Sequence, residues 1–181
     1  MVRRLYILPI LLFILLPAAC SGDTALRGDP PETAAYVDLR RYAGQWHEIA
    51  RYPNRFQSEC GEATAIYTLE KDGSMTVVNR CQTSSGLKET RGTARVSDPS
   101  SGNARLRVSF FRPFYGDYWI FHLGTEYDHA AVGTPDRKYL WILSRTPSMD
   151  AELYRELLEK MRARGFDPER LLVTGKVNAK Y

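Results

Sequence analysis

Eight short segments with the composition of β-strands follow one another between residues 44 and 144, and no helix-like segment interrupts them. β-Branched and aromatic residues favour strands, and turn signals such as Asp72-Gly73 separate the segments. The predicted strands are residues 44–52, 63–69, 74–79, 89–96, 104–111, 117–123, 130–133 and 138–144. Short connections between consecutive strands make neighbours antiparallel, so the sequence predicts an all-β fold in hairpin order.

An eight-stranded up-and-down β-barrel is the predicted architecture, because closing the sheet removes its exposed edges. A barrel of eight strands can hold one small ligand. One strong helix follows the eighth strand, with Ser148 as the predicted N-cap and Gly165 at its end. Its apolar stripe consists of Leu153, Leu157, Leu158 and Met161. We expect the helix to pack on the outside of the barrel; a membrane-binding or partner-binding helix is the alternative. Residues 171–174 are expected to add a short strand.

The N-terminus has the proportions of a signal peptide over residues 1–19, with two early arginines and an apolar run too short for a comfortable membrane span. The run ends in Leu-Pro-Ala-Ala-Cys, which resembles the lipobox at which bacterial lipoproteins are cleaved and lipidated. Pro17 departs from that pattern. We expect lipidation of Cys20, and an ordinary secretory signal cut after Ala19, which would leave a free thiol, is the alternative.

Three further segments follow from composition. Residues 20–36 are rich in Gly, Pro, Asp and Ala and predict a lipidated N-terminus with a flexible tether. Residues 37–174 form one predicted domain, and residues 175–181 a C-terminal tail.

Removing the two signal-peptide arginines lowers the formal net charge from +4 to +2. Because this excess of positive charge is small, the sequence predicts no nucleic-acid partner.

The chain has three cysteines, and an odd number in an exported protein requires an explanation. Acylation of Cys20 would leave Cys60 and Cys81 as a pair. The hairpin about Asp72-Gly73 lies between these two cysteines and brings their positions close in register. We therefore predict a Cys60–Cys81 disulfide; catalytic or metal-binding use of the two cysteines is the alternative.

A candidate ligand cavity follows from strand parity. Leu106, Val108 and Phe110 alternate with polar neighbours, which predicts one buried and one wet face. The cavity residues predicted by this parity are Ala65, Tyr67, Val77, Ala94, Val96, Leu106, Val108 and Phe110. Plain core packing is the alternative for each of them. The inward side chains of residues 117–123 stay unassigned, because four consecutive residues there are apolar or aromatic.

Three ordered stretches, residues 44–53, 126–133 and 139–147, resemble the conserved regions of lipocalins. Gly44-Gln45-Trp46 alone could be a chance triplet. The three stretches in this order, however, are specific for the lipocalin pattern. The resemblance covers about residues 37–174 and is closest to bacterial outer-membrane lipocalins and apolipoprotein D, including residues 109–118. Glu126 and His47 depart from the usual pattern and affect the barrel ends.

The resemblance implies a lipocalin calyx whose floor is closed by Arg145 lying across Trp46. Gly44, Trp46, Tyr127 and Arg145 are then structural residues, and none of them is catalytic. With the lipobox, the resemblance implies a lipocalin that carries fatty acids or lysophospholipids. It would be anchored at the outer membrane through Cys20, with Ser21 as the sorting residue and the barrel facing the periplasm.

Two other functions stay open: an enzyme acting on a lipid, and an interaction protein with a filled barrel that docks through residues 111–118. The chain has no Ser-His-Asp order, no Gly-x-Ser-x-Gly and no metal-ligand cluster, and His47, His122 and His129 are scattered. We therefore expect no enzyme activity, no cofactor and no metal site. A homodimer is left open.

Overall fold

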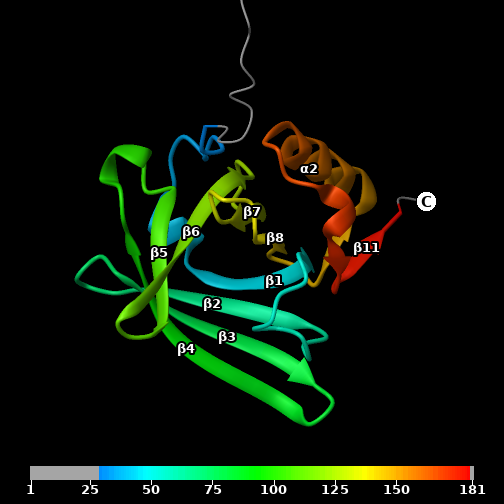
Figure 1. The fold of residues 1–181 in the computed structure, drawn as a ribbon, viewed down its shortest axis with the longest axis horizontal. Coiled ribbons are helices and arrows are strands. Elements are labelled where there is room, and N and C mark those ends of the chain that lie inside the picture. Colours follow the sequence, from blue (N-terminus) through cyan, green and yellow to red (C-terminus); the bar gives the residue numbers. More distant parts are fainter. Residues whose placement is uncertain (1–28, 180–181) are drawn as a thin grey trace, which may run out of the picture.

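The computed structural model describes residues 29–179, and eight of its strands close into an antiparallel barrel (Figure 1). The barrel strands are β1 (Gly44–Arg51), β2 (Ala63–Leu69), β3 (Met75–Thr83), β4 (Gly86–Val96), β5 (Arg105–Phe111), β6 (Phe114–Leu123), β7 (His129–Gly133) and β8 (Leu140–Ser144). Each strand pairs with the next, and β8 pairs back with β1. The predicted fold class is confirmed.

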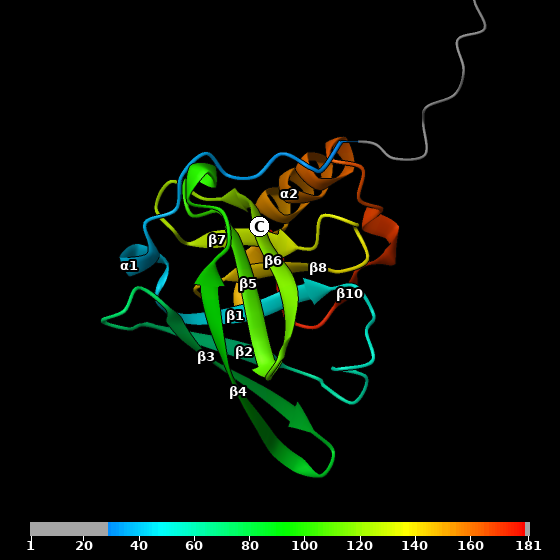
Figure 2. The same cartoon turned by 60° about the vertical axis from the view of Figure 1, so that its left-hand side comes forward.

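The closed end of the barrel begins with a short helix that the sequence did not predict, α1 (Leu39–Tyr42). Asp38 caps it by accepting hydrogen bonds from the backbone N–H groups of Arg40 and Arg41. Figure 2 shows α1 beside the start of β1, at the end of the barrel away from the tip of the β3–β4 hairpin. We call the opposite end, with the β1–β2, β3–β4, β5–β6 and β7–β8 connections, the open end.

β1 changes partners along its length. Residues 44–47 pair with β2, whereas Ala50 and Arg51 pair with β10 (Leu172–Val173), which is the short strand predicted near residue 171. On its other side β1 pairs with β8, with a bulge between Glu48 and Ala50. At the open end, β10 therefore takes the place of β2 as the partner on this side of β1.

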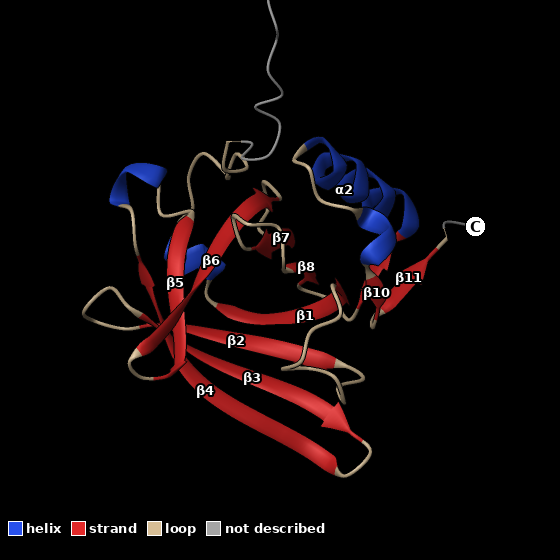
Figure 3. Cartoon of the chain, viewed as in Figure 1, coloured by secondary structure: helices blue, strands red, loops and turns tan. Residues whose placement is uncertain are grey.

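The β3–β4 hairpin extends further than the sequence predicted. Its pairing runs to Thr83 and Gly86, whereas the expected strands stopped at residue 79 and began at residue 89. β4 pairs with β5 only over Thr93–Val96, so the ribbon projects beyond the rest of the sheet (Figure 3). Most residues of the projecting part are exposed, on both faces, which removes the apolar–polar alternation that marks a strand in a sequence.

Helix α2 (Ala151–Ala163) packs on the outside of the barrel, as expected (Figure 1). Leu157 and Met161 are fully buried against residues of β1 and β8, and Leu153 is partly buried with them, whereas Leu158 is only half-buried. The predicted N-cap was wrong: Asp150 caps the helix by accepting hydrogen bonds from Glu152 and Leu153 N–H groups. No helix within residues 29–179 has the length and apolar character needed to cross a bilayer.

Two segments expected to be irregular are ordered. Ser148, the expected N-cap, begins β9 (Ser148–Asp150), which pairs in parallel with β11 (Lys176–Asn178), a strand within the predicted tail. Within the predicted tether, Ala34 N–H donates to the Ile120 carbonyl at 2.8 Å. Backbone hydrogen bonds thus fix segments whose composition predicted flexibility.

Two short 3₁₀ turns, Pro99–Ser101 and Pro168–Arg170, complete the fold. The predicted signal peptide and Cys20 lie outside the described residues.

The predicted disulfide between Cys60 and Cys81 is confirmed, with Cα atoms 5.4 Å apart. It ties the β1–β2 connection to β3, where Ala63 pairs with Cys81. Closing a loop of 21 residues stabilises the fold by roughly 3 kcal/mol in the chain-entropy account. The disulfide therefore fixes a connection that lies at the open end.

Candidate functional site

The floor of the barrel is built on Trp46 and Arg145. The guanidinium carbon of Arg145 lies 3.9 Å from the centroid of the fully buried indole of Trp46. The same guanidinium donates to the carbonyls of Gln45 (2.9 Å) and Arg41 (2.7 Å), and the Trp46 indole N–H donates to the Tyr42 carbonyl at 2.9 Å. Arg145 thus satisfies carbonyls at the end of α1 while it covers the ring, as the resemblance implied.

Gly44 and Tyr127 complete this floor. Gly44 has φ +100°, and a Cβ there would lie 3.2 Å from Nη1 of Arg145, so both conformation and space favour glycine. The Tyr127 carbonyl accepts from Arg145 Nε at 3.1 Å, and its hydroxyl accepts from Asp38 N–H at 2.9 Å. The four motif residues predicted from the sequence therefore meet at the closed end.

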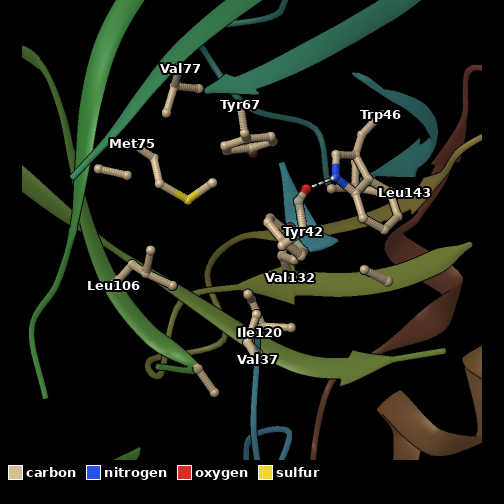
Figure 4. Packing of buried hydrophobic residues seen from close by; sticks show 13 residues of the cluster. Val37, Tyr42, Trp46, Tyr67, Met75, Val77, Leu106, Ile120, Val132 and Leu143 are labelled. Carbon is tan, nitrogen blue, oxygen red and sulfur yellow. Dashed lines mark hydrogen bonds between the residues drawn. The ribbon is translucent and has the colours of Figure 1, made fainter. Parts of the chain in front are cut away.

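All eight predicted cavity residues belong to one cluster with Trp46 in the barrel interior. Tyr67, Val77, Ala94 and Leu106 are buried, and Ala65, Val96, Val108 and Phe110 are partly buried. Figure 4 shows Tyr67 beside its register partner Val77 and near Met75, with Ile120 and Val132 apart from them across the interior. Val108 and Phe110 pack against this cluster and remain partly exposed.

Three tyrosine hydroxyls meet inside this apolar lining. The Tyr118 hydroxyl lies 2.7 Å from that of Tyr42 and accepts from that of Tyr67 at 2.8 Å. Burial raises the pKa of all three tyrosines, that of Tyr67 to about 12, so all three keep their protons at neutral pH. The three hydroxyl groups carry three protons, and the two hydrogen bonds between them use two. The third proton can be donated to an acceptor on a ligand or to a water molecule.

Strand β6 carries the inward residues that the sequence left unassigned. Tyr118 and Ile120 belong to the interior cluster, whereas Phe121 packs outside against Phe166. Four consecutive apolar or aromatic residues hide the alternation of this strand, which is why parity alone could not assign it, and a bulge follows between Ile120 and His122. Tyr118 pairs with Leu106 in register, so the assignment of β5 was the signal that could have identified it.

A buried ion pair at the open end of β1 was also missed. Arg51 Nη1 donates to Glu48 Oε1 at 2.5 Å, and the residues are 2% and 6% exposed respectively. Gln57 Nε2 donates to Glu48 Oε2 at 2.7 Å, and Arg51 Nη2 donates to the Cys60 carbonyl at 2.8 Å. The pair thus binds the β1–β2 connection to the barrel beside the disulfide. Two charges three residues apart normally indicate a solvated surface, so nothing in the sequence marked them as buried.

Comparison with known proteins places this architecture in a family. The model of the lipocalin-like domain matches residues 37–176. Outer membrane lipoprotein Blc of Escherichia coli (strain K12) is 40% identical over 163 residues, which is 87% of this chain and 88% of the relative. Temperature-induced lipocalin-1 of Arabidopsis thaliana is 40% identical over 148 residues, or 77% and 80% of the two chains.

Solved structures agree in fold. Insecticyanin from the tobacco hornworm Manduca sexta superposes with a TM-score of 0.66, covering 84% of this chain and 92% of its own, at 16% sequence identity. That likeness concerns the fold alone. The match of the domain model and the two relatives at 40% identity settles the family: the chain belongs to the lipocalin-like domain family.

Proposed function

We propose that the protein binds or carries small hydrophobic ligands, namely fatty acids, lysophospholipids or similar membrane lipids, in the cell envelope. The observation that carries this proposal is the apolar cluster inside the barrel, in which Val108 and Phe110 remain partly exposed. Apolar lumens with a few hydroxyl groups suit a long acyl chain whose head group stays near water at the open end. The relatives named as an outer membrane lipoprotein and as a lipocalin support the same reading.

Val108→Arg is expected to weaken binding of a fluorescent fatty acid by tenfold or more, about 1.4 kcal/mol. The arginine would occupy acyl-chain volume and place a charge in an apolar lumen. Titration of the probe measures the affinity, and circular dichroism first confirms that the variant is folded.

Arg107→Ala is the matched control, because Arg107 is the exposed neighbour of Val108 and faces Asp117 and Tyr115 outside the barrel. Its affinity should equal that of the wild type. Equal affinity in folded Val108→Arg would place the ligand outside the lumen and contradict the proposal.

We further propose that acylated Cys20 anchors the protein at the outer membrane, with the barrel facing the periplasm. Cys20→Ala is expected to move the protein from the membrane pellet to the soluble fraction, because one residue carries the lipid. Ser21→Asp is the second variant, since aspartate after the lipidated cysteine favours the inner membrane in bacterial lipoproteins; it should stay in the pellet but fractionate with inner membrane. Sedimentation of Cys20→Ala like wild type would contradict the anchor.

A second candidate function is an interaction protein that binds no lipid and docks through the β5–β6 hairpin. Phe111 and Phe114 at its tip are 75% and 76% exposed, and Tyr115 follows them. Exposed aromatic residues of this kind mark contact surfaces. Mass spectrometry of lipids extracted from the purified protein separates the two candidates, and conversion of a bound lipid would instead favour an enzyme. Binding without turnover is the function we propose.

A further inference from the structure

Two of the three histidines face each other on the outer wall of the barrel. His122 lies near the end of β6 and His129 begins β7, and the β6–β7 hairpin brings their Nε2 atoms to 3.3 Å. The ring centroids are 5.3 Å apart and the ring planes differ by 26°. Their neighbours Leu123 and Ala130 belong to the interior cluster, which places the two imidazoles on the outer side. The sequence presented them as scattered residues.

The distance between the two nitrogens fits a shared metal ion. Zinc–nitrogen bonds of about 2.0–2.1 Å at a tetrahedral angle hold two nitrogen ligands about 3.3 Å apart. The described structure has the same 3.3 Å separation, with the Nε2 atoms closer together than the ring centroids. Each imidazole therefore directs its Nε2 edge towards the other, and an ion between them requires little rearrangement.

Asp128 supports one of the rings. Its Oδ1 lies 2.9 Å from Nδ1 of His129, but this contact is not aligned as a hydrogen bond, so the buried nitrogen has no hydrogen-bond partner in the described structure. A histidine that binds a metal through Nε2 commonly directs its Nδ1–H to a carboxylate, which fixes the tautomer. Gly124 makes this approach possible, because a Cβ at that position would lie 2.7 Å from Nδ1 of His129.

Charged side chains surround the two imidazoles. Lys160 and Arg164 act on His122, and Asp128 lies beside His129. The positive charges of Lys160 and Arg164 oppose a cation, whereas Asp128 favours it, so we expect a site of moderate affinity.

Solvent can complete the coordination. His122 lines an outer groove of about 490 Å³ between residues 32–36 and the β6–β7 hairpin. Within residues 29–179, no three side chains of His, Cys, Asp or Glu gather as metal ligands, so two positions of a tetrahedral ion would be taken by water.

We propose that His122 and His129 bind one Zn²⁺ ion, or a similar late first-row divalent ion, through their Nε2 atoms, with Asp128 orienting His129. This site lies on the outer wall, separate from the lumen, and does not depend on lipid binding.

The test is calorimetric titration of the full-length protein with Zn²⁺ at pH 7.5, with wild type expected to bind one ion. His122→Gln and His129→Gln should each weaken binding at least tenfold, and Asp128→Asn about tenfold because the ring loses its orienting partner. His47→Gln is the matched control, since His47 is the remaining histidine and lies near Gln45 on β1. Its affinity should be unchanged.

A second measurement needs no variant. Zn²⁺ should shift the imidazole proton resonances of His122 and His129 in the wild-type protein and leave those of His47 in place. Wild type that binds no Zn²⁺ would leave the pair as a simple hydrogen bond and overturn the proposal. Undiminished binding by a folded His122→Gln/His129→Gln double variant would also overturn it.

Discussion

Trp46→Ala is expected to lower the free energy of unfolding by about 3 to 5 kcal/mol. The indole is fully buried, its ring lies 5.0 Å from that of Tyr42, and its N–H is bonded to the Tyr42 carbonyl. Removing it opens a cavity at the floor, and Arg145 loses the ring over which its guanidinium lies. Urea unfolding followed by far-ultraviolet circular dichroism measures the change without relying on tryptophan fluorescence.

Trp119→Ala is the matched control for this variant. Trp119 lies on the outer side of β6, half-buried, with the Arg105 guanidinium 4.4 Å from its ring. Its removal should cost about 1 to 2 kcal/mol, because only part of the ring is withdrawn from water. If the two variants lost equal stability, Trp46 would not close the floor of the barrel.

Arg51→Met is expected to destabilise the protein by about 3 to 5 kcal/mol, and Glu48→Leu by a similar amount. Each single substitution leaves the other charge buried without its partner, because the two residues are 2% and 6% exposed. The Glu48 carboxylate would retain only neutral donors, Gln57 and the Thr174 hydroxyl at 2.8 Å.

The double variant Glu48→Leu/Arg51→Met is the decisive comparison. It removes both charges and replaces them with apolar groups of similar size, so its loss of stability should be much smaller than the sum of the single losses. The same urea unfolding experiments give the coupling energy. Additive losses would mean that the two side chains do not interact in the folded protein.

The sequence was sufficient to assign residues to the inner or outer side of the barrel where one face of a strand is solvent-exposed and the other is apolar. On β5, Leu106, Val108 and Phe110 alternate with polar neighbours, and all three belong to the interior cluster or pack against it. The same reasoning stopped at β6, where consecutive apolar or aromatic residues hide the period of two. The motif residues Trp46 and Arg145 were found through the family resemblance.

Other features depended on distant contacts. Asp150 rather than Ser148 caps α2 because Ser148 pairs with Lys176, a partner 28 positions away that no local pattern specifies. The burial of Glu48 and Arg51 depends on the β1–β2 connection folding over them, and the approach of His122 to His129 depends on the register of the β6–β7 hairpin. Local composition carries none of this information.

The projecting part of the β3–β4 ribbon has a free strand edge, which affects the tendency of the protein to aggregate. Beyond Thr93 towards the turn, β4 has β3 on one side and, within the described chain, no strand from β5 on the other. An unpaired strand edge can template pairing with a second chain, and charged side chains oppose it. Lys88, Glu89 and Arg91 occupy this edge and are exposed. The edge is thereby protected against intermolecular strand addition, which matters most for proteins concentrated on a two-dimensional surface.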